Sequence, residues 1–76
     1  MMYLDSMTLM GIVTGITRNT KRVEKIRKAS GWKRLAQIEQ IDRYLCAECA
    51  AHRVKLTDEE KTYCIHKVLD YVRHTA

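Results

Sequence analysis

The chain has 76 residues, 14 Lys or Arg against 9 Asp or Glu, a formal net charge of +5, 46% hydrophobic residues and no Pro. A chain of this length forms one domain with a small core, which excludes a large enzyme fold with a deep substrate cleft. The apolar content is too high for a disordered chain, and the lack of Pro favours uninterrupted helices. We therefore expect one all-α domain over residues 1–76, with three or four helices.

The first helix is expected from about Ser6, although its β-branched residues and two glycines leave a short strand possible. The residues that would face the core share one arc at helical spacing: Leu9, Ile12, Val13 and Ile16. Gly11 and Gly15 are four apart, a spacing that favours close packing inside the domain or self-association through a thin helix face. Every basic residue follows this segment, and the apolar run is too short to span a bilayer, so we expect no signal peptide and no membrane helix.

The positive charge is concentrated between positions 18 and 34. This basic segment holds eight basic residues and Glu24, a surplus of seven, whereas the rest of the chain has six basic and eight acidic residues, a net −2. Its basic residues are Arg18, Lys21, Arg22, Lys25, Arg27, Lys28, Lys33 and Arg34. We expect a basic helix from Thr20 to Ala29, ended by Ser30 and Gly31, and the residues leave open whether it continues from the first helix. Such a segment attracts phosphates, anionic lipid or an acidic protein face.

The C-terminal half is predicted to be an antiparallel helical hairpin over residues 32–73, because only a few residues separate two helical patterns. The first of these helices spans about 32–54, and its expected apolar stripe is Leu35, Ile38, Ile41, Leu45, Cys49 and His52. The second spans Asp58 to Arg73, with an expected core face of Cys64, Ile65, Val68, Leu69, Tyr71 and Val72 and a polar face that includes Glu60. Thr57 and Glu60 have the spacing of a capping box at its start.

The cysteines and histidines suggest one arrangement for a zinc ion. Cys64 and His66 are separated by about 200° on a helix and cannot bind the same ion. The allowed ligand set is Cys46, Cys49, His52 and Cys64. Free cysteines also pack as small hydrophobic residues, and the three alanines at 47, 50 and 51 favour a helix over a zinc loop. We therefore expect three core thiols, no metal and no other cofactor, with this zinc set as the alternative.

The sequence matches neither a helix-turn-helix nor a catalytic cysteine site. The region 23–41 has a helix, a turn with Gly31 and a second helix, but Arg27 replaces a small residue, and Gln37 and Gln40 fall where a helix-turn-helix requires buried positions. A catalytic cysteine needs an activating base in an exposed cleft, and the sequence has no Cys-His signature of that kind. We expect no enzymatic activity.

The leading hypothesis is a small cytoplasmic binding protein that presents its basic segment to an acidic surface of a larger protein and modulates it, as a phage or mobile-element inhibitor would. The expected contact residues are Lys21, Arg22, Lys25, Lys28, Trp32, Lys33 and Arg34. Trp32 lies among cations, where it would serve as an aromatic anchor. We expect a homodimer, because a domain this small gains a larger core by pairing. The alternatives are nonspecific nucleic-acid binding and the structural zinc domain.

Overall fold

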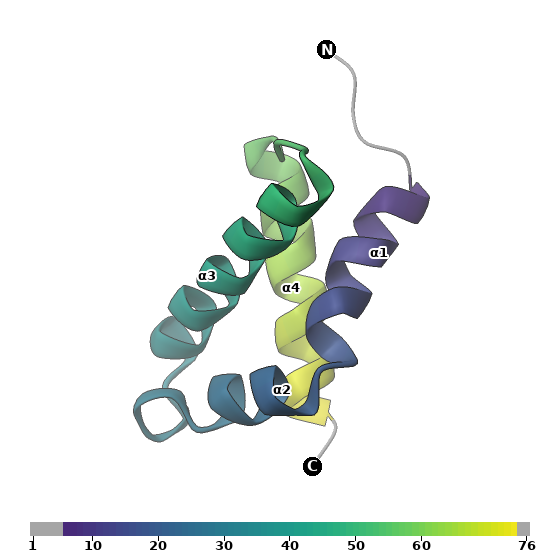
Figure 1. Cartoon of the computed structure of the whole chain (residues 1–76). Coiled ribbons are helices and arrows are strands. Elements are labelled where there is room, and N and C mark those ends of the chain that lie inside the picture. The colour runs from purple at the N-terminus through teal and green to yellow at the C-terminus, as the bar shows by residue number, and fades with distance from the viewer. Residues whose placement is uncertain (1–5, 75–76) are drawn as a thin grey trace.

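The computed structural model describes residues 6–74, apart from the side chains of Ser6, Ser30 and Trp32. The described elements are α1 (Ser6–Thr17), α2 (Thr20–Arg27), the 3-10 turn η1 (Ala29–Trp32), α3 (Arg34–His52) and α4 (Asp58–His74) (Figure 1). No strand occurs among these residues, so the predicted all-α fold is confirmed and the short-strand alternative for the first segment is wrong. None of the described helices is long and apolar enough to cross a membrane.

A single cap separates α1 from α2 and settles whether they form one helix. The Asn19 backbone is extended, with φ −90° and ψ 102°, and its side-chain oxygen accepts a hydrogen bond of 3.2 Å from the Arg22 amide. The Asn19 amide donates back to the Ile16 carbonyl at 3.2 Å and closes the end of α1. An Asn in this role supplies an acceptor for an unpaired amide at a helix start. The chain can therefore turn here and send α2 across the end of the molecule (Figure 1).

Helix α4 packs against both α1 and α3, while α2 packs mainly on α3. The core includes residues from all four helices: Ile12, Ile16, Val23, Ile26, Ile41, Leu45, Cys64, Val68, Leu69 and Val72. The buried arc predicted for the first helix is confirmed, with Ile12 and Ile16 fully buried. Because α4 shares its contacts between α1 and α3, the predicted hairpin is not confirmed as a unit of its own.

The buried face of α3 differs from the predicted stripe at both ends. Leu35 is 71% exposed and His52 is also exposed, whereas Gln37 is fully buried. Leu35 lies about 120° around the helix from Ile41, outside the arc that faces the core. The side-chain Nε2 of Gln37 donates a hydrogen bond of 3.4 Å to the Arg27 carbonyl at the end of α2. This bond gives the buried Gln37 side chain a polar partner. The prediction of Leu35 and His52 in the apolar stripe was therefore wrong, and the buried Gln37 lies outside the predicted stripe.

Helix α4 begins with the predicted capping box. The Glu60 amide donates to the Thr57 hydroxyl at 3.2 Å, and the Glu60 carboxylate accepts from the Thr57 amide at 2.8 Å. This reciprocal pairing buries Glu60, which the sequence pattern had placed on the polar face. Tyr71, expected in the core, is exposed, because the neighbouring helices cover the edge of α4 that carries Leu69.

We expect Thr57→Ala to lower the free energy of unfolding by about 1 kcal/mol, because the Glu60 amide loses its acceptor in a partly buried helix start. Urea denaturation followed by circular dichroism measures this loss. Thr62→Ala is the matched control, since the Thr62 hydroxyl donates only to the Asp58 carbonyl on the exposed side of the same helix. Equal losses in the two variants would contradict a stabilising capping box.

Candidate functional site

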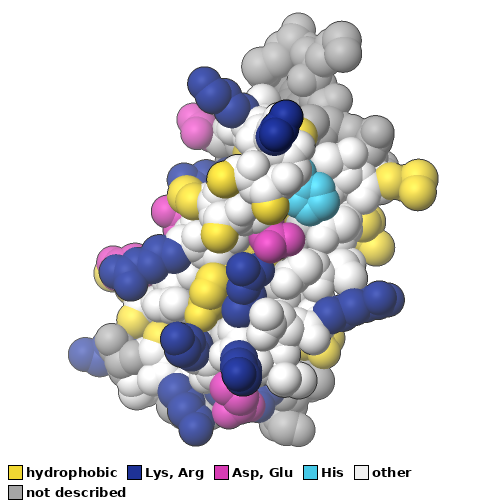
Figure 2. All heavy atoms as spheres, viewed as in Figure 1, with side chains coloured by type: hydrophobic (Ala, Val, Ile, Leu, Met, Phe, Trp, Pro, Cys, Tyr) yellow, Lys and Arg dark blue, Asp and Glu magenta, His cyan; other side chains and the backbone are white. Residues whose placement is uncertain are grey.

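The residues predicted to bind a partner fall into two groups in the structure. Five of them are exposed: Lys21 and Lys25 lie in α2, Lys28 and Lys33 flank the turn η1, and Arg34 is the first residue of α3. We call these five residues the basic surface. Figure 2 shows Lys and Arg side chains gathered over the end of the molecule where Figure 1 places these elements. The side chain of Trp32 lies outside the described residues.

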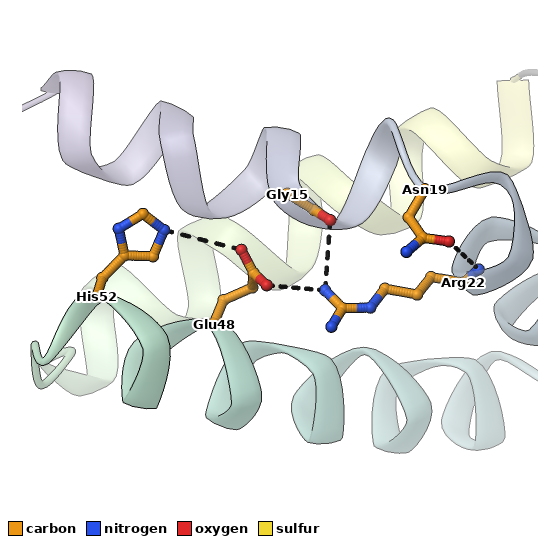
Figure 3. Close-up of polar contacts among 5 residues, drawn as sticks. All are labelled: Gly15, Asn19, Arg22, Glu48 and His52. Carbon is orange, nitrogen blue, oxygen red and sulfur yellow. Dashed lines mark hydrogen bonds and ion pairs between the residues drawn. The ribbon is translucent and has the colours of Figure 1, made fainter.

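Arg22 differs from the other predicted contact residues because the fold uses its charge internally. Its Nη1 donates to the Glu48 carboxylate at 2.9 Å and to the Gly15 carbonyl at 3.3 Å (Figure 3). The guanidinium also lies 4.9 Å from the centre of the Tyr44 ring, a distance at which a cation and a π face attract. The Arg22 side chain is 24% exposed and the Glu48 side chain 16% exposed. This ion pair therefore joins α1, α2 and α3 and does not face a partner.

Glu24 also modifies the charge of the basic surface. It pairs with Arg27 at 2.7 Å and, more loosely, with Lys28 at 3.8 Å, both within one helical turn. Exposed pairs of this kind add little stability, so Lys28 stays available to an outside anion. The rest of the basic surface, Lys21, Lys25, Lys33 and Arg34, projects into solvent without a neighbouring carboxylate among the ion pairs described for residues 6–74.

A shallow, open groove lies between α1 and α3 and reaches the start of α2. It is lined by Met10, Gly11, Thr14, Gly15, Arg18, Asn19, Thr20, Lys21, Glu48 and His52. The Glu48 carboxylate lies in it beside Arg22, and His52 Nε2 is 3.8 Å from the second Glu48 oxygen (Figure 3). The groove therefore carries a carboxylate and an imidazole on one side and two cations at one end.

The three cysteines are free and lie in different environments. Cys46 is exposed, Cys49 is half-buried and Cys64 is fully buried. No group of three or more Cys, His, Asp or Glu residues within positions 6–74 is placed to hold a metal ion, so the fold does not assemble the alternative zinc set. Burial raises the pKa of the Cys49 thiol and that of the Cys64 thiol. This direction is opposite to the one that activates a nucleophilic cysteine.

Asp42 of α3 pairs with Lys61 of α4. Lys61 Nζ lies 2.9 Å from Asp42 Oδ1, and the hydrogen bond to Asp42 raises the pKa of the Lys61 ammonium. Lys61 also lines a small pocket beside Cys46 and Cys49. This pair is a surface link between α3 and α4 and is not part of the basic surface.

Comparison with protein-family models, with characterised proteins and with solved structures gave no match. The site must therefore be judged from its own residues. The sequence pattern did not identify Glu48 and Tyr44 as partners of Arg22, because polar or large residues beside the apolar stripe carry no periodic signal of their own. The signal that could have found Glu48 is Gly15: a side chain there would collide with the Glu48 carboxylate.

We expect Arg22→Gln to lower the free energy of unfolding by about 1–3 kcal/mol, because it leaves the Glu48 carboxylate without its cation in a partly buried site. Lys28→Gln removes the same charge from an exposed pair and should cost less than about 0.5 kcal/mol. Thermal and urea denaturation of both variants measure the difference. If both variants were as stable as the unaltered chain, the Arg22 cluster would not stabilise the fold.

The cysteines should react with a thiol reagent in the order of their exposure. At pH 8 we expect Cys46 to be modified first and Cys49 more slowly, since its raised pKa lowers the fraction of thiolate. Cys64 should react only when the domain unfolds. Mass spectrometry after timed labelling gives the order, and Cys46→Ser should remove the fast phase alone. Rapid labelling of Cys64 in the folded protein would contradict its burial.

Proposed function

We propose that this chain is a small non-enzymatic binding protein whose basic surface engages an acidic face of a larger protein and so modulates that protein, for example as an inhibitor. The observation that carries the proposal is the exposure of Lys21, Lys25, Lys28, Lys33 and Arg34 along one continuous stretch of chain. A surface of one sign speeds association with a partner of opposite sign and limits the choice of partner. Trp32 is proposed as the aromatic anchor within it.

The proposed contact set is narrower than the sequence pattern suggested. Arg22 is already paired with Glu48, and removing it for a partner would leave that carboxylate without its cation. Within the proposed surface, α2 is anchored to the core by its buried Val23 and Ile26. Its exposed lysines therefore stand on a fixed helix, which limits the ordering cost when a partner binds.

Nucleic-acid binding is a second candidate, and the arrangement of α2, η1 and α3 favours it. Two helices are joined by a tight turn in which Gly31 has a φ of +66°, and Gln37 of the second helix is buried. Burial of Gln37 removes one objection to a helix-turn-helix, while Arg27 still stands where that motif requires a small residue. In this case the cations would contact phosphates with little base specificity.

We further propose that the protein is a homodimer and acts in the cytoplasm. Support for the compartment comes from its three unpaired cysteines, one of them exposed, which a reducing environment preserves. Support for the dimer comes from size, since a 76-residue domain has a small core of its own.

The triple variant Lys25→Glu, Lys28→Glu and Lys33→Glu should lose binding to the partner, because it reverses the sign of the proposed surface. The matched control replaces Lys55, Lys67 and Arg73 with Glu, which changes the net charge equally at exposed positions outside the basic segment. Affinity purification with the unaltered chain as bait should recover a protein that the control retains and the triple variant loses. Equal recovery by all three chains would show that the basic surface is only a solvated face.

Titration with mixed-sequence duplex and single-stranded oligonucleotides separates the two candidates. A nucleic-acid-binding protein should lose affinity steeply as salt rises, with a log–log slope of about −0.9 per phosphate contacted on duplex DNA. No binding at low salt would exclude the nucleic-acid candidate. Tight, salt-sensitive binding that the triple variant abolishes would instead overturn the protein-partner proposal.

A further inference from the structure

A pair of cysteines lies one helical turn apart near the end of α3. Cys46 is exposed and Cys49 is half-buried, and both line one partly open pocket of about 390 Å³. The pocket lies where the end of α3 meets the start of α4 (Figure 1). Residues three apart on a helix are neighbours on the same side of it. Two thiols therefore share one space, and the functions proposed above use neither of them.

The walls of this pocket are held in place by the way α3 ends. Arg53 adopts a left-handed conformation with φ 56°, and the Val54 amide donates to the Cys49 carbonyl at 3.0 Å. These features end the helix and turn the chain back, and Val54 and Leu56 then pack against the core, as Cys49 does. Because apolar side chains form part of the wall, a group bound to the thiols is partly shielded from water.

Lys61 of α4 brings a positive charge to the two thiols. It lines the same pocket, and its Nζ is held 2.9 Å from Asp42 Oδ1. Burial and the charge of Cys46 raise the pKa of the Cys49 thiol, whereas the charge of Lys61 acts in the opposite direction. The two thiols and the ammonium therefore interact electrostatically, and Lys61 offsets negative charge that develops on the sulfur atoms.

The spacing of the two cysteines favours a bridging metal ion over a disulfide. Cβ atoms three residues apart on a helix are about 5–6 Å from each other. A disulfide requires a Cβ separation of about 3.5–4.5 Å, so forming one here would distort the helix. A metal ion adds two metal–sulfur bonds of about 2.3 Å, which allows the sulfur atoms to be about 4.6 Å apart. An undistorted helix can supply that separation.

We propose that Cys46 and Cys49 bind one copper(I) ion between their two thiolates. Thiolates select soft cations, and copper(I) is satisfied by two such ligands. Zinc prefers four ligands, and no group of three or more Cys, His, Asp or Glu residues within positions 6–74 is placed to hold a metal ion. Each thiol releases one proton on binding, and the complex carries one net negative charge, which the lysines at 55 and 61 in the pocket offset. Because Cys46 is exposed, the ion can enter and leave through an incoming thiol ligand.

Anaerobic titration of the reduced full chain with copper(I), in competition with a coloured copper(I) chelator, tests the proposal. The unaltered chain should take up one equivalent. Cys46→Ser and Cys49→Ser should each raise the dissociation constant by about a hundredfold or more, because loss of a residue that only supports a ligand already costs about 10–100-fold. Cys64→Ala is the matched control, since its thiol is buried outside the pair, and circular dichroism shows that each variant is folded. No uptake by the unaltered chain, or equal affinity in all three variants, would overturn the proposal.

Two further measurements use the same titration. One equivalent of copper(I) should protect Cys46 of the unaltered chain from a thiol reagent, and undiminished labelling would overturn the site. Lys61→Gln should keep the stoichiometry but raise the dissociation constant by about threefold or more, because it removes a nearby positive charge. Lys67→Gln, at an exposed lysine of the same helix, should leave the affinity unchanged. Displacement of copper(I) by an equal concentration of zinc(II) would overturn the assignment to a soft cation.

Discussion

The contact between Glu48 and Gly15 sets the arrangement of the N-terminal half of this fold. Helix α3 places a carboxylate against the backbone of α1 at Gly15, where an added side chain would have to displace it. A partly buried carboxylate needs a cation, and Arg22 supplies it from the first turn of α2 while also donating to the Gly15 carbonyl. The Asn19 cap then provides the turn that brings Arg22 into position.

The consequence for function is that the fold divides the basic segment. Arg22 points inward and stabilises the junction of three helices, while Lys21 and Lys25 lie on the exposed side of the same short helix and Lys28 caps its end. Val23 and Ile26 bury the opposite side of α2 and so hold the exposed lysines in place. The stability of the junction and the presentation of positive charge therefore depend on one eight-residue helix.

Much of this fold could be predicted from the sequence, and the exceptions have a common cause. Ile12 and Ile16, the capping box at Thr57 and the start of the last helix follow from periodicity and local hydrogen bonding, which depend on near neighbours only. Gln37, Glu48 and Glu60 were not predicted inside, because their burial depends on partners contributed by other segments or by a cap. Leu35 was wrongly predicted to lie in the buried stripe for the converse reason: it is apolar, but no described helix covers it. The exposed lysines could be predicted from the sequence as a charged segment. That Arg22 does not belong to their surface could be seen only from its tertiary contact with Glu48.

The two glycines of α1 lie in different surroundings. Their spacing of four suggested a single small-residue face, but Gly15 lies against the Glu48 carboxylate inside the molecule and a Cβ at Gly11 would meet nothing within 4 Å. A glycine inside a helix costs about 1 kcal/mol relative to alanine, and at Gly15 the close approach of α3 accounts for that cost. Within the single chain nothing accounts for it at Gly11, since an alanine there would fit.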